Sequence, residues 1–244
     1  MLIPVNELVR NFDVRPNGVL HVGAHLAEES SMYEAQGWHG SSRIFWVESQ
    51  DILVEKLKLN LDSEIHEVYC ATAWDVSGVR MQFHHTNNSQ SSSVLDLHEH
   101  KTKYPSIRVD RSYEVTTSRL DELFRPGQFD FIALDIQGAE LHALLGLGEL
   151  LKGVKWIYSE VNKVELYKNC ALIQDLDNYL DSCGFVRVAT RWAFRSGWGD
   201  ALWIRQELVH HKLRRVVRTK SKNFWLFLKY SFRYIAGRLI PFRD

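Results

Sequence analysis

The chain has 244 residues, of which 45% are hydrophobic and 25% charged, a composition that predicts one large α/β domain with a full core. Thirty basic residues balance thirty acidic ones, so the net charge gives no reason to expect a nucleic acid partner. Three cysteines without a C-x-x-C pair predict neither a disulfide framework nor a zinc site and favour a cytoplasmic location. Because no run of about 18 apolar residues occurs, and the N-terminal segment lacks an unbroken apolar core, we expect neither a membrane span nor a signal peptide.

Apolar runs alternate with helical patterns along most of the chain. The segments that we expect to form strands are residues 19–24, 43–49, 66–74, 129–138, 155–161, 185–190 and 201–206. The segments that we expect to form helices are residues 25–38, 50–62, 139–153 and 170–184. This alternation predicts a Rossmann-like α/β fold, with a mostly parallel sheet and helices on both faces.

The last two expected strands are joined by "RWAFRSGWGD", which is too short for a helical crossover, so we expect them to be antiparallel neighbours. A seven-stranded sheet with a reversed last strand is typical of class I S-adenosylmethionine-dependent methyltransferases. Residues 79–118 lack a long helical pattern and predict a small β insertion. We therefore expect one domain over residues 1–205 and a basic extension over residues 206–244.

The loop after the first strand has Gly23, Ala24 and His25 but lacks the G-x-G-x-x-G pattern of dinucleotide sites. A sulfonium cofactor has no phosphate to bind and needs close backbone approach at only one or two points, which Gly23 and Ala24 would allow. The alternative is that Gly23 only turns the strand. Glu48 ends the neighbouring strand, where its carboxylate could accept both ribose hydroxyls of an adenosine, and Ala71 could form a wall for adenine.

Three carboxylates follow the later strands. Asp135 ends one apolar run, Glu140 opens the next helix, and Glu160 ends the following strand. We expect them to orient a hydroxyl nucleophile, with one of them, or a nearby histidine, accepting its proton. Asp135 is the residue we expect to be catalytic, and we expect both Asp135 and His25 to contact the cofactor as well. Two alternatives stay open: Glu140 could only complement the helix dipole, and the pair at the strand ends could hold a divalent cation such as magnesium.

Several motifs make the chain resemble the FkbM family of methyltransferases. They are "VGAH" (22–25), "WVES" (46–49), "NNSQSSSVLDLHEH" (87–100), "RLDEL" (119–123), "LDIQGAEL" (134–141), "YSEV" (158–161) and "GWGDALWI" (197–204). The resemblance implies S-adenosylmethionine-dependent O-methylation of a sugar, glycan or natural-product hydroxyl. It implies that Gly23 and Glu48 lie at the cofactor and Asp135 at the reaction centre. Ala27 departs from the glycine that many members carry.

Two further segments are candidates for the acceptor site. In "TNNSQSSS" (86–93), Asn88, Ser92 and Ser93 would close over the cofactor or acceptor, unless the segment is only a flexible loop. Between the last two strands, Trp192 and Trp198 offer flat faces for a sugar ring.

Polar side chains accompany these aromatic residues. Asp200, with Arg191 and Arg195, could bind hydroxyls or an acidic sugar, and the alternative is a hairpin turn held by aromatic packing. Four histidines in the insertion fit no metal motif, and we expect them to lie on the surface: His84, His85, His98 and His100.

The C-terminal extension is basic and amphipathic over about residues 210–240. Such a helix is typical of a membrane-surface or partner-binding element, although packing on its own domain or on a second subunit is an equal alternative. We therefore expect a cytoplasmic enzyme that could be peripheral to a membrane. The competing hypothesis is a non-catalytic methyltransferase-fold module that works through this helix. A nicotinamide-dependent oxidoreductase is disfavoured by the missing glycines and the reversed strand.

Overall fold

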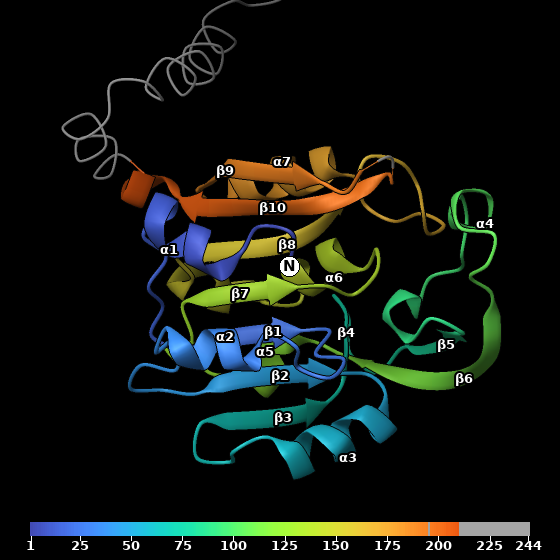
Figure 1. Cartoon of the computed structure of the whole chain (residues 1–244), viewed down its shortest axis with the longest axis horizontal. Helices are drawn as coiled ribbons and strands as arrows, with labels where there is room; N and C mark the ends of the chain where they lie inside the picture. Colours follow the sequence, from blue (N-terminus) through green and yellow to red (C-terminus); the bar gives the residue numbers. More distant parts are fainter. Residues whose placement is uncertain (195, 210–244) are drawn as a thin grey trace, which may run out of the picture. The chain divides into compact units, whose positions relative to one another are not determined.

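A seven-stranded sheet forms the centre of the computed structural model, which describes residues 1–194 and 196–209 (Figure 1). The strand order is β3-β2-β1-β7-β8-β10-β9. The strands are β1 (Val19–Val22), β2 (Ile44–Glu48), β3 (His66–Cys70), β7 (Phe131–Leu134), β8 (Trp156–Asn162), β9 (Phe185–Trp192) and β10 (Trp198–Arg205). In this sheet β10 alone runs opposite to the other six strands. The predicted class I methyltransferase fold with a reversed last strand is confirmed.

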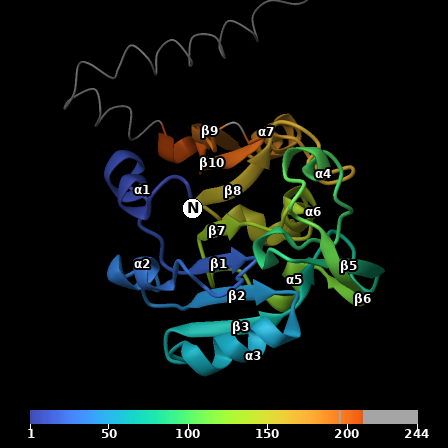
Figure 2. The same cartoon turned by 45° about the vertical axis from the view of Figure 1, so that its right-hand side comes forward.

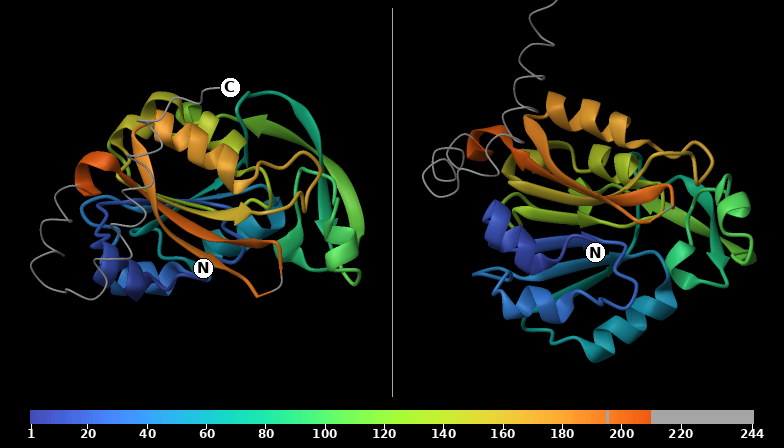
Figure 3. Two further views of the ribbon diagram at one scale, coloured as in Figure 1. Left: turned by 90° about the horizontal axis from the view of Figure 1, so that it is seen from above. Right: turned by 45° about the horizontal axis from the view of Figure 1, so that its top comes forward.

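Helices cover both faces of the sheet (Figure 3). One face carries α1 (Val5–Phe12) and α2 (Ser30–Ala35), and the other carries α6 (Glu140–Leu145) and α7 (Ile173–Ser182). The remaining helical elements are α3 (Asp51–Asn60), α4 (His100–Lys103), α5 (Leu120–Leu123) and two 3-10 helices, η1 (Ser89–Ser91) and η2 (Gly148–Gly153).

The two faces have different cores because alternate residues of a strand point to opposite sides. On the face with α2, Tyr33 stacks on Trp46 of β2 and on Trp38. On the opposite face, Leu20 and Val22 join the large apolar cluster that includes α6 and α7. Burial on both faces explains why β1, β2, β7 and β8 are apolar throughout most of their length.

The predicted β insertion is a hairpin of β5 (Arg80–Thr86) and β6 (Val109–Ser118), to which β4 (Thr72–Ala73) adds a short parallel strand. The elements η1 and α4 lie between β5 and β6 in the chain. In Figure 1 the arrowheads of the parallel strands point towards this insertion, and Figure 2 shows it from a second side. The fold therefore brings the insertion to the carboxyl ends of the strands, which is where open α/β sheets bind ligands.

Two expected helices are shorter than the sequence pattern predicts. The helix expected over residues 25–38 begins only at Ser30, because His25 (φ 46°) and Ala27 (φ 55°) adopt left-handed backbone conformations that a helix does not allow. The helix expected over residues 139–153 divides into α6 and η2 near Gly148 (φ 48°).

Residues Met1–Arg205 form one compact unit. The basic helix expected over about residues 210–240 lies outside the described residues and stays a prediction, as do the membrane or subunit contacts assigned to it. Within residues 1–194 and 196–209, no helix is both long and apolar enough to cross a membrane.

Candidate functional site

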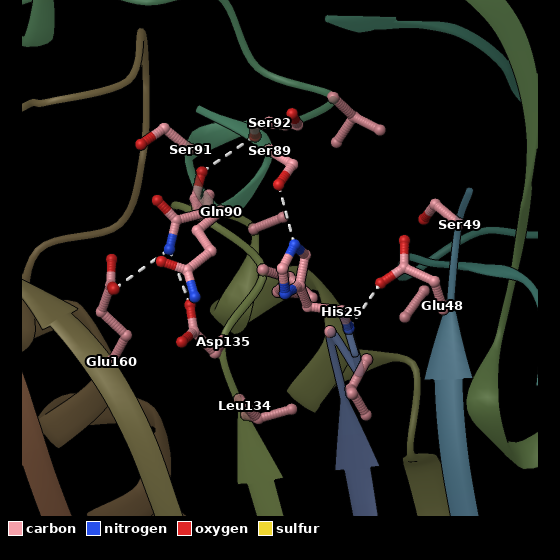
Figure 4. A pocket seen from close by; sticks show the side chains of 18 of the residues that line it. His25, Glu48, Ser49, Ser89, Gln90, Ser91, Ser92, Leu134, Asp135 and Glu160 are labelled. Atoms are coloured by element: carbon pink, nitrogen blue, oxygen red, sulfur yellow. Dashed lines mark hydrogen bonds between the residues drawn. The ribbon is translucent and has the colours of Figure 1, made fainter. Parts of the chain in front are cut away.

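A cavity of about 610 Å³ opens at the carboxyl ends of the strands. Following the strand order, β2 supplies Glu48, β1 leads into Gly23, β7 leads into Asp135, and β8 supplies Glu160. Because β10 is reversed, it contributes its first residues, including Asp200, to the same edge. The segment around η1 covers the site, as Figure 4 shows with Ser89, Ser91 and Ser92 above the strand ends.

The Glu48 carboxylate is held in place by two backbone amides. The His25 amide donates to Oε2 (Figure 4), and the Gln50 amide donates to Oε1, both at 2.9 Å. Burial raises the pKa of Glu48, and these two hydrogen bonds oppose that shift by favouring the ionised form. Each carboxylate oxygen can accept a second hydrogen bond, so Glu48 keeps acceptor capacity for two hydroxyl groups in the cavity.

Gly23 lies at the closest approach between the ends of β1 and β7. It has a φ of 89°, and a side-chain carbon placed on it would lie 1.9 Å from the carbonyl oxygen of Asp135. The amides of Gly23 and Ala24 both donate to the Val47 carbonyl, which fixes this loop to β2. Gly23 therefore allows β1 to lie close to Asp135, the residue that the sequence predicts to be catalytic.

Three of the other predicted cofactor residues line the cavity and one does not. Ala71, His25 and Asp135 are part of its wall. Ala24 is 1% exposed and lies outside the lining. The predicted direct contact of Ala24 with a cofactor is corrected to a role in holding the loop.

His25 joins the β1 loop to the insertion. Its Nε2 lies 2.8 Å from Ser89 Oγ, and its Nδ1 lies 2.6 Å from Glu28 Oε1 (Figure 4). A second link connects His85 Nδ1 with Gln50 Oε1 at 2.9 Å. Both links end beside Glu48, so the cover of the cavity is attached to the loops that flank this carboxylate.

The predicted polar residues of the cover all line the cavity: Asn88, Ser92 and Ser93. Their side chains also shape the segment itself. Ser92 Oγ accepts from the Thr86 amide at 3.1 Å, and Ser93 Oγ donates to the Gln137 carbonyl at 2.8 Å. The serine-rich stretch is thus a folded loop that is hydrogen-bonded to the strand ends.

Gln137 links the two carboxylates at the strand ends. Its Nε2 donates to Asp135 Oδ1 at 2.6 Å and to Glu160 Oε2 at 3.1 Å, and its Oε1 accepts from the Tyr167 hydroxyl at 2.6 Å. Gln137 has a φ of 56°, which turns its side chain back over the rim. Neither Gln137 nor Tyr167 was among the predicted site residues, because a glutamine and a loop tyrosine show no chemical signal in a sequence.

The Asp135–Glu160 pair can hold a proton near neutral pH. Burial, with the neighbouring carboxylates Asp200 and Glu29, raises the pKa of Asp135 to about 6, although the hydrogen bond from Gln137 opposes the shift. Burial and the charge of Asp135 raise the pKa of Glu160 well above its ordinary value. Both carboxyl groups therefore bind a proton more readily than carboxylates in water do, and the pair can share one proton.

Glu140 does not line the cavity, which corrects its predicted catalytic role. Its Oε1 accepts from the amides of Ile136 at 3.1 Å and Gly138 at 3.0 Å, so it holds the loop between β7 and α6. Burial raises the pKa of Glu140 to about 7. Glu140 is only 1% exposed.

The two predicted tryptophans differ in position. Trp198 lines the cavity. Trp192 lies outside the lining, packs against the main core, and has Lys163 Nζ 3.9 Å from its ring centroid. Its predicted contact with a sugar is therefore not supported by its position, because the core and a lysine occupy its faces.

Asp200 lines the cavity but is already engaged with the first residues of the chain. It accepts from the Leu2 amide and from the Tyr158 hydroxyl, and the Ile3 amide donates to the same Tyr158 oxygen at 3.1 Å. Arg191 binds the Leu2 carbonyl at 2.9 Å and Glu7. Arg195 lies outside the described residues.

The histidines of the insertion are not all on the surface. His98 is exposed, His84 and His85 are half-buried, and His100 is only 4% exposed and lines the cavity. The expectation for His100 was wrong, because α4 folds back against the loop after β8. Among the residues that the structure describes, no group of three His, Cys, Asp or Glu side chains has an arrangement that could hold a metal ion.

A model of the FkbM methyltransferase domain matches residues 21–187, which include every strand of the main sheet except β10 and part of β1 and β9. The chain belongs to the FkbM methyltransferase family. The match covers the Glu48 carboxylate and the Asp135–Glu160 pair, whereas Trp198 and Asp200 of the same cavity lie beyond it.

Individual relatives agree with this assignment. The chain is 31% identical over 99 residues to the 2-O-methyltransferase NoeI of Sinorhizobium fredii, a match that covers 36% of this chain and 41% of that protein. The chain thus spans less than half the length of this curated relative. The solved FkbM methyltransferase of Methylobacillus flagellatus shares the fold with a TM-score of 0.51 and 16% identity, over 77% of this chain and 43% of that one.

Proposed function

We propose that the protein transfers a methyl group from S-adenosylmethionine to a hydroxyl group of a sugar, glycan or natural-product acceptor. The observation that carries this proposal is the presence, in one cavity, of a hydrogen-bonded carboxylate at the end of β2 and a proton-binding carboxylate pair at the ends of β7 and β8. Family membership and a relative named as a 2-O-methyltransferase support the choice of oxygen as the acceptor atom.

The residues at the β2 end suit an adenosyl cofactor. The cavity of about 610 Å³ lies in the range of roughly 300–1,000 Å³ that is typical of cofactor sites. Glu48 would accept the two ribose hydroxyls, and the small side chains of Ala71 and Ala73 leave room for a flat ring beside β4. When bound, S-adenosylmethionine supplies a methyl group that is already activated on a sulfonium sulfur.

The residues at the β8 end would position and deprotonate the acceptor. Asp135, ionised at pH 7, accepts the proton of the acceptor hydroxyl. Gln137 keeps the carboxylates of Asp135 and Glu160 in fixed positions by donating to both. Alignment of the hydroxyl with the methyl group would provide much of the rate increase.

The first test is calorimetric titration of the full chain with S-adenosylmethionine and S-adenosylhomocysteine. We expect micromolar binding that weakens at least tenfold in Glu48→Gln, because an amide cannot accept from two hydroxyls as a carboxylate does. Glu55→Gln is the matched control, since Glu55 is exposed on α3 outside the cavity.

The titration is repeated with magnesium, because the carboxylates at the strand ends were also predicted to hold a divalent cation. Tighter binding in its presence would support that additional role. Failure of a folded wild-type chain to bind either cofactor form would contradict the proposal and favour the non-catalytic module.

A further inference from the structure

The cavity extends past Asp135 and Glu160 to a wall of which the sequence predicted only Trp198. This wall, here called the acceptor wall, consists of His100, Tyr104, Leu166, Tyr167 and Trp198. It joins α4, the loop after β8 and the start of β10. In the strand order it lies at the β8 and β10 end of the cavity, whereas Glu48 lies at the β2 end.

Backbone hydrogen bonds hold the acceptor wall together. The amides of His98 and His100 donate to the Leu166 carbonyl at 2.9 and 3.1 Å, and Leu97 pairs with Tyr167 in an isolated bridge. Trp198 and Tyr104 pack against the small apolar cluster around Leu166 and Tyr167. The wall is therefore a built part of the fold, with an aromatic surface next to the carboxylate pair.

Two polar atoms of the acceptor wall lack partners within the described part of the chain. They are Nδ1 of His100, a residue that is 96% buried, and the hydroxyl oxygen of Tyr104. Burial lowers the pKa of His100, so its imidazole is neutral and can both donate and accept a hydrogen bond. A buried polar atom without a partner destabilises the free protein, and a ligand hydroxyl would supply that partner.

The charge around the acceptor wall is negative. Among the described residues, the cavity lining includes six carboxylates and no lysine or arginine, and the N-terminal amine of Met1 in this lining is paired with one of the carboxylates, Glu29, at 3.4 Å. Asp135, Glu160 and Asp200 are the carboxylates at the β7, β8 and β10 side. Arg191, which the sequence offered as a partner for an acidic sugar, is bound instead to Glu7 and to the Leu2 carbonyl.

We propose that the acceptor wall binds a sugar ring that carries no acid group, with one face of the ring on Trp198 and its hydroxyls hydrogen-bonded to His100 and Tyr104. A ring that bears a protonated amine is accepted, because the surrounding carboxylates attract it, and a ring that bears a carboxylate is rejected by repulsion. This inference rests on the proposed function and specifies its substrate class.

The charge selection can be tested with three methyl glycosides of matched shape: a glucoside, a glucosaminide and a glucuronide. Each is titrated by ligand-observed NMR into the full chain saturated with S-adenosylhomocysteine. We expect the glucosaminide to bind at least as tightly as the glucoside, and the glucuronide to bind at least fivefold more weakly. A smaller loss for the glucuronide overturns the charge selection.

The outcome also separates this inference from the proposed function. If S-adenosylhomocysteine binds and none of the three glycosides does, the sugar site is overturned while the cofactor site stands. If S-adenosylhomocysteine does not bind to the folded chain, the proposed function itself fails.

The hydroxyl of Tyr104 gives a second test. Tyr104→Phe removes only the unpartnered oxygen, so we expect binding of the neutral glucoside to weaken at least fivefold while cofactor binding and Tm are not lowered. Tyr113→Phe is the control, because Tyr113 belongs to β6 of the same insertion and does not line the cavity. If Tyr104→Phe binds the glucoside as tightly as the wild type, the assignment of this hydroxyl to the acceptor is overturned.

Discussion

Gln137 shows how a residue without acid–base chemistry can determine what two carboxylates do. Its amide group donates to Asp135 and Glu160, and Tyr167 fixes the other end of that amide. Without these donors, the two neighbouring carboxylates would repel each other more strongly. The sequence identified Asp135 and Glu160 because acidic residues at strand ends are recognisable, whereas the left-handed backbone at Gln137 is visible only in the structure.

The pKa of Asp135 predicts how the rate of methyl transfer depends on pH. Because this pKa is raised to about 6, the ionised form of Asp135 is lost below that pH, and kcat should fall nearly tenfold per pH unit there. Above pH 7 the rate should level off. Asp135→Asn should bind cofactor normally but lose about 10²–10⁴-fold in kcat, which is the usual contribution of a general base.

The measurement is kcat between pH 5 and 8 with a glycoside that the chain accepts. The control variant is Asp110→Asn, which changes an exposed carboxylate on β6 outside the cavity. A wild-type profile that stays flat from pH 5 to 7 would remove Asp135 from the role of base.

At the level of the elements, the sequence predicted the strands well because each is a run of apolar residues with a polar end. The carboxyl ends of parallel strands lie at the same edge of a sheet. The sequence alone therefore predicted that Glu48, Asp135 and Glu160 belong to one site. The contacts between distant segments could not be predicted. The binding of α4 to Leu166 and of Asp200 to Leu2 joins residues whose pairing leaves no local pattern in the sequence.

The turn between β1 and the following loop predicts a specific effect of replacing Gly23. Gly23→Ala would place its methyl carbon 1.9 Å from the Asp135 carbonyl oxygen, in addition to the strain of a φ of 89°. Gly127→Ala is a matched control, because Gly127 has a φ of 85° and open space around it. We expect Gly127→Ala to lower the free energy of unfolding by about 1–2 kcal/mol through backbone strain alone.

Gly23→Ala should lower the free energy of unfolding by at least twice as much as Gly127→Ala does. It should also weaken cofactor binding, because the ends of β1 and β7 must separate. Urea denaturation and calorimetric titration of both variants give the two quantities. Equal losses of stability in the two variants would mean that the close approach of β1 to β7 is not important for the fold.

At the level of the whole molecule, the site places three carboxyl groups where burial disfavours their charge. The pKa of Asp135 is raised to about 6, that of Glu140 to about 7, and that of Glu160 well above its ordinary value. A carboxyl group whose pKa is higher in the folded than in the unfolded state stabilises the fold when it is protonated. The contribution of such a group to the free energy of unfolding is complete below about pH 4. It is lost as the pH rises through the pKa of the group in the folded state.

These three groups should therefore make the free energy of unfolding fall between pH 5 and pH 8. Glu140→Gln separates the contribution of one group, because a glutamine oxygen can still accept from the Ile136 and Gly138 amides but carries no charge. We expect this variant to match the wild type near pH 5 and to be more stable at pH 8, by an amount on the order of 1–3 kcal/mol.

Glu149→Gln, an exposed change in η2, should keep the pH dependence of the wild type. Denaturation curves at pH 5 and pH 8 provide the comparison. If Glu140→Gln is no more stable than the wild type at pH 8, the charge of this carboxylate does not oppose folding, and the pH dependence must come from Asp135 and Glu160.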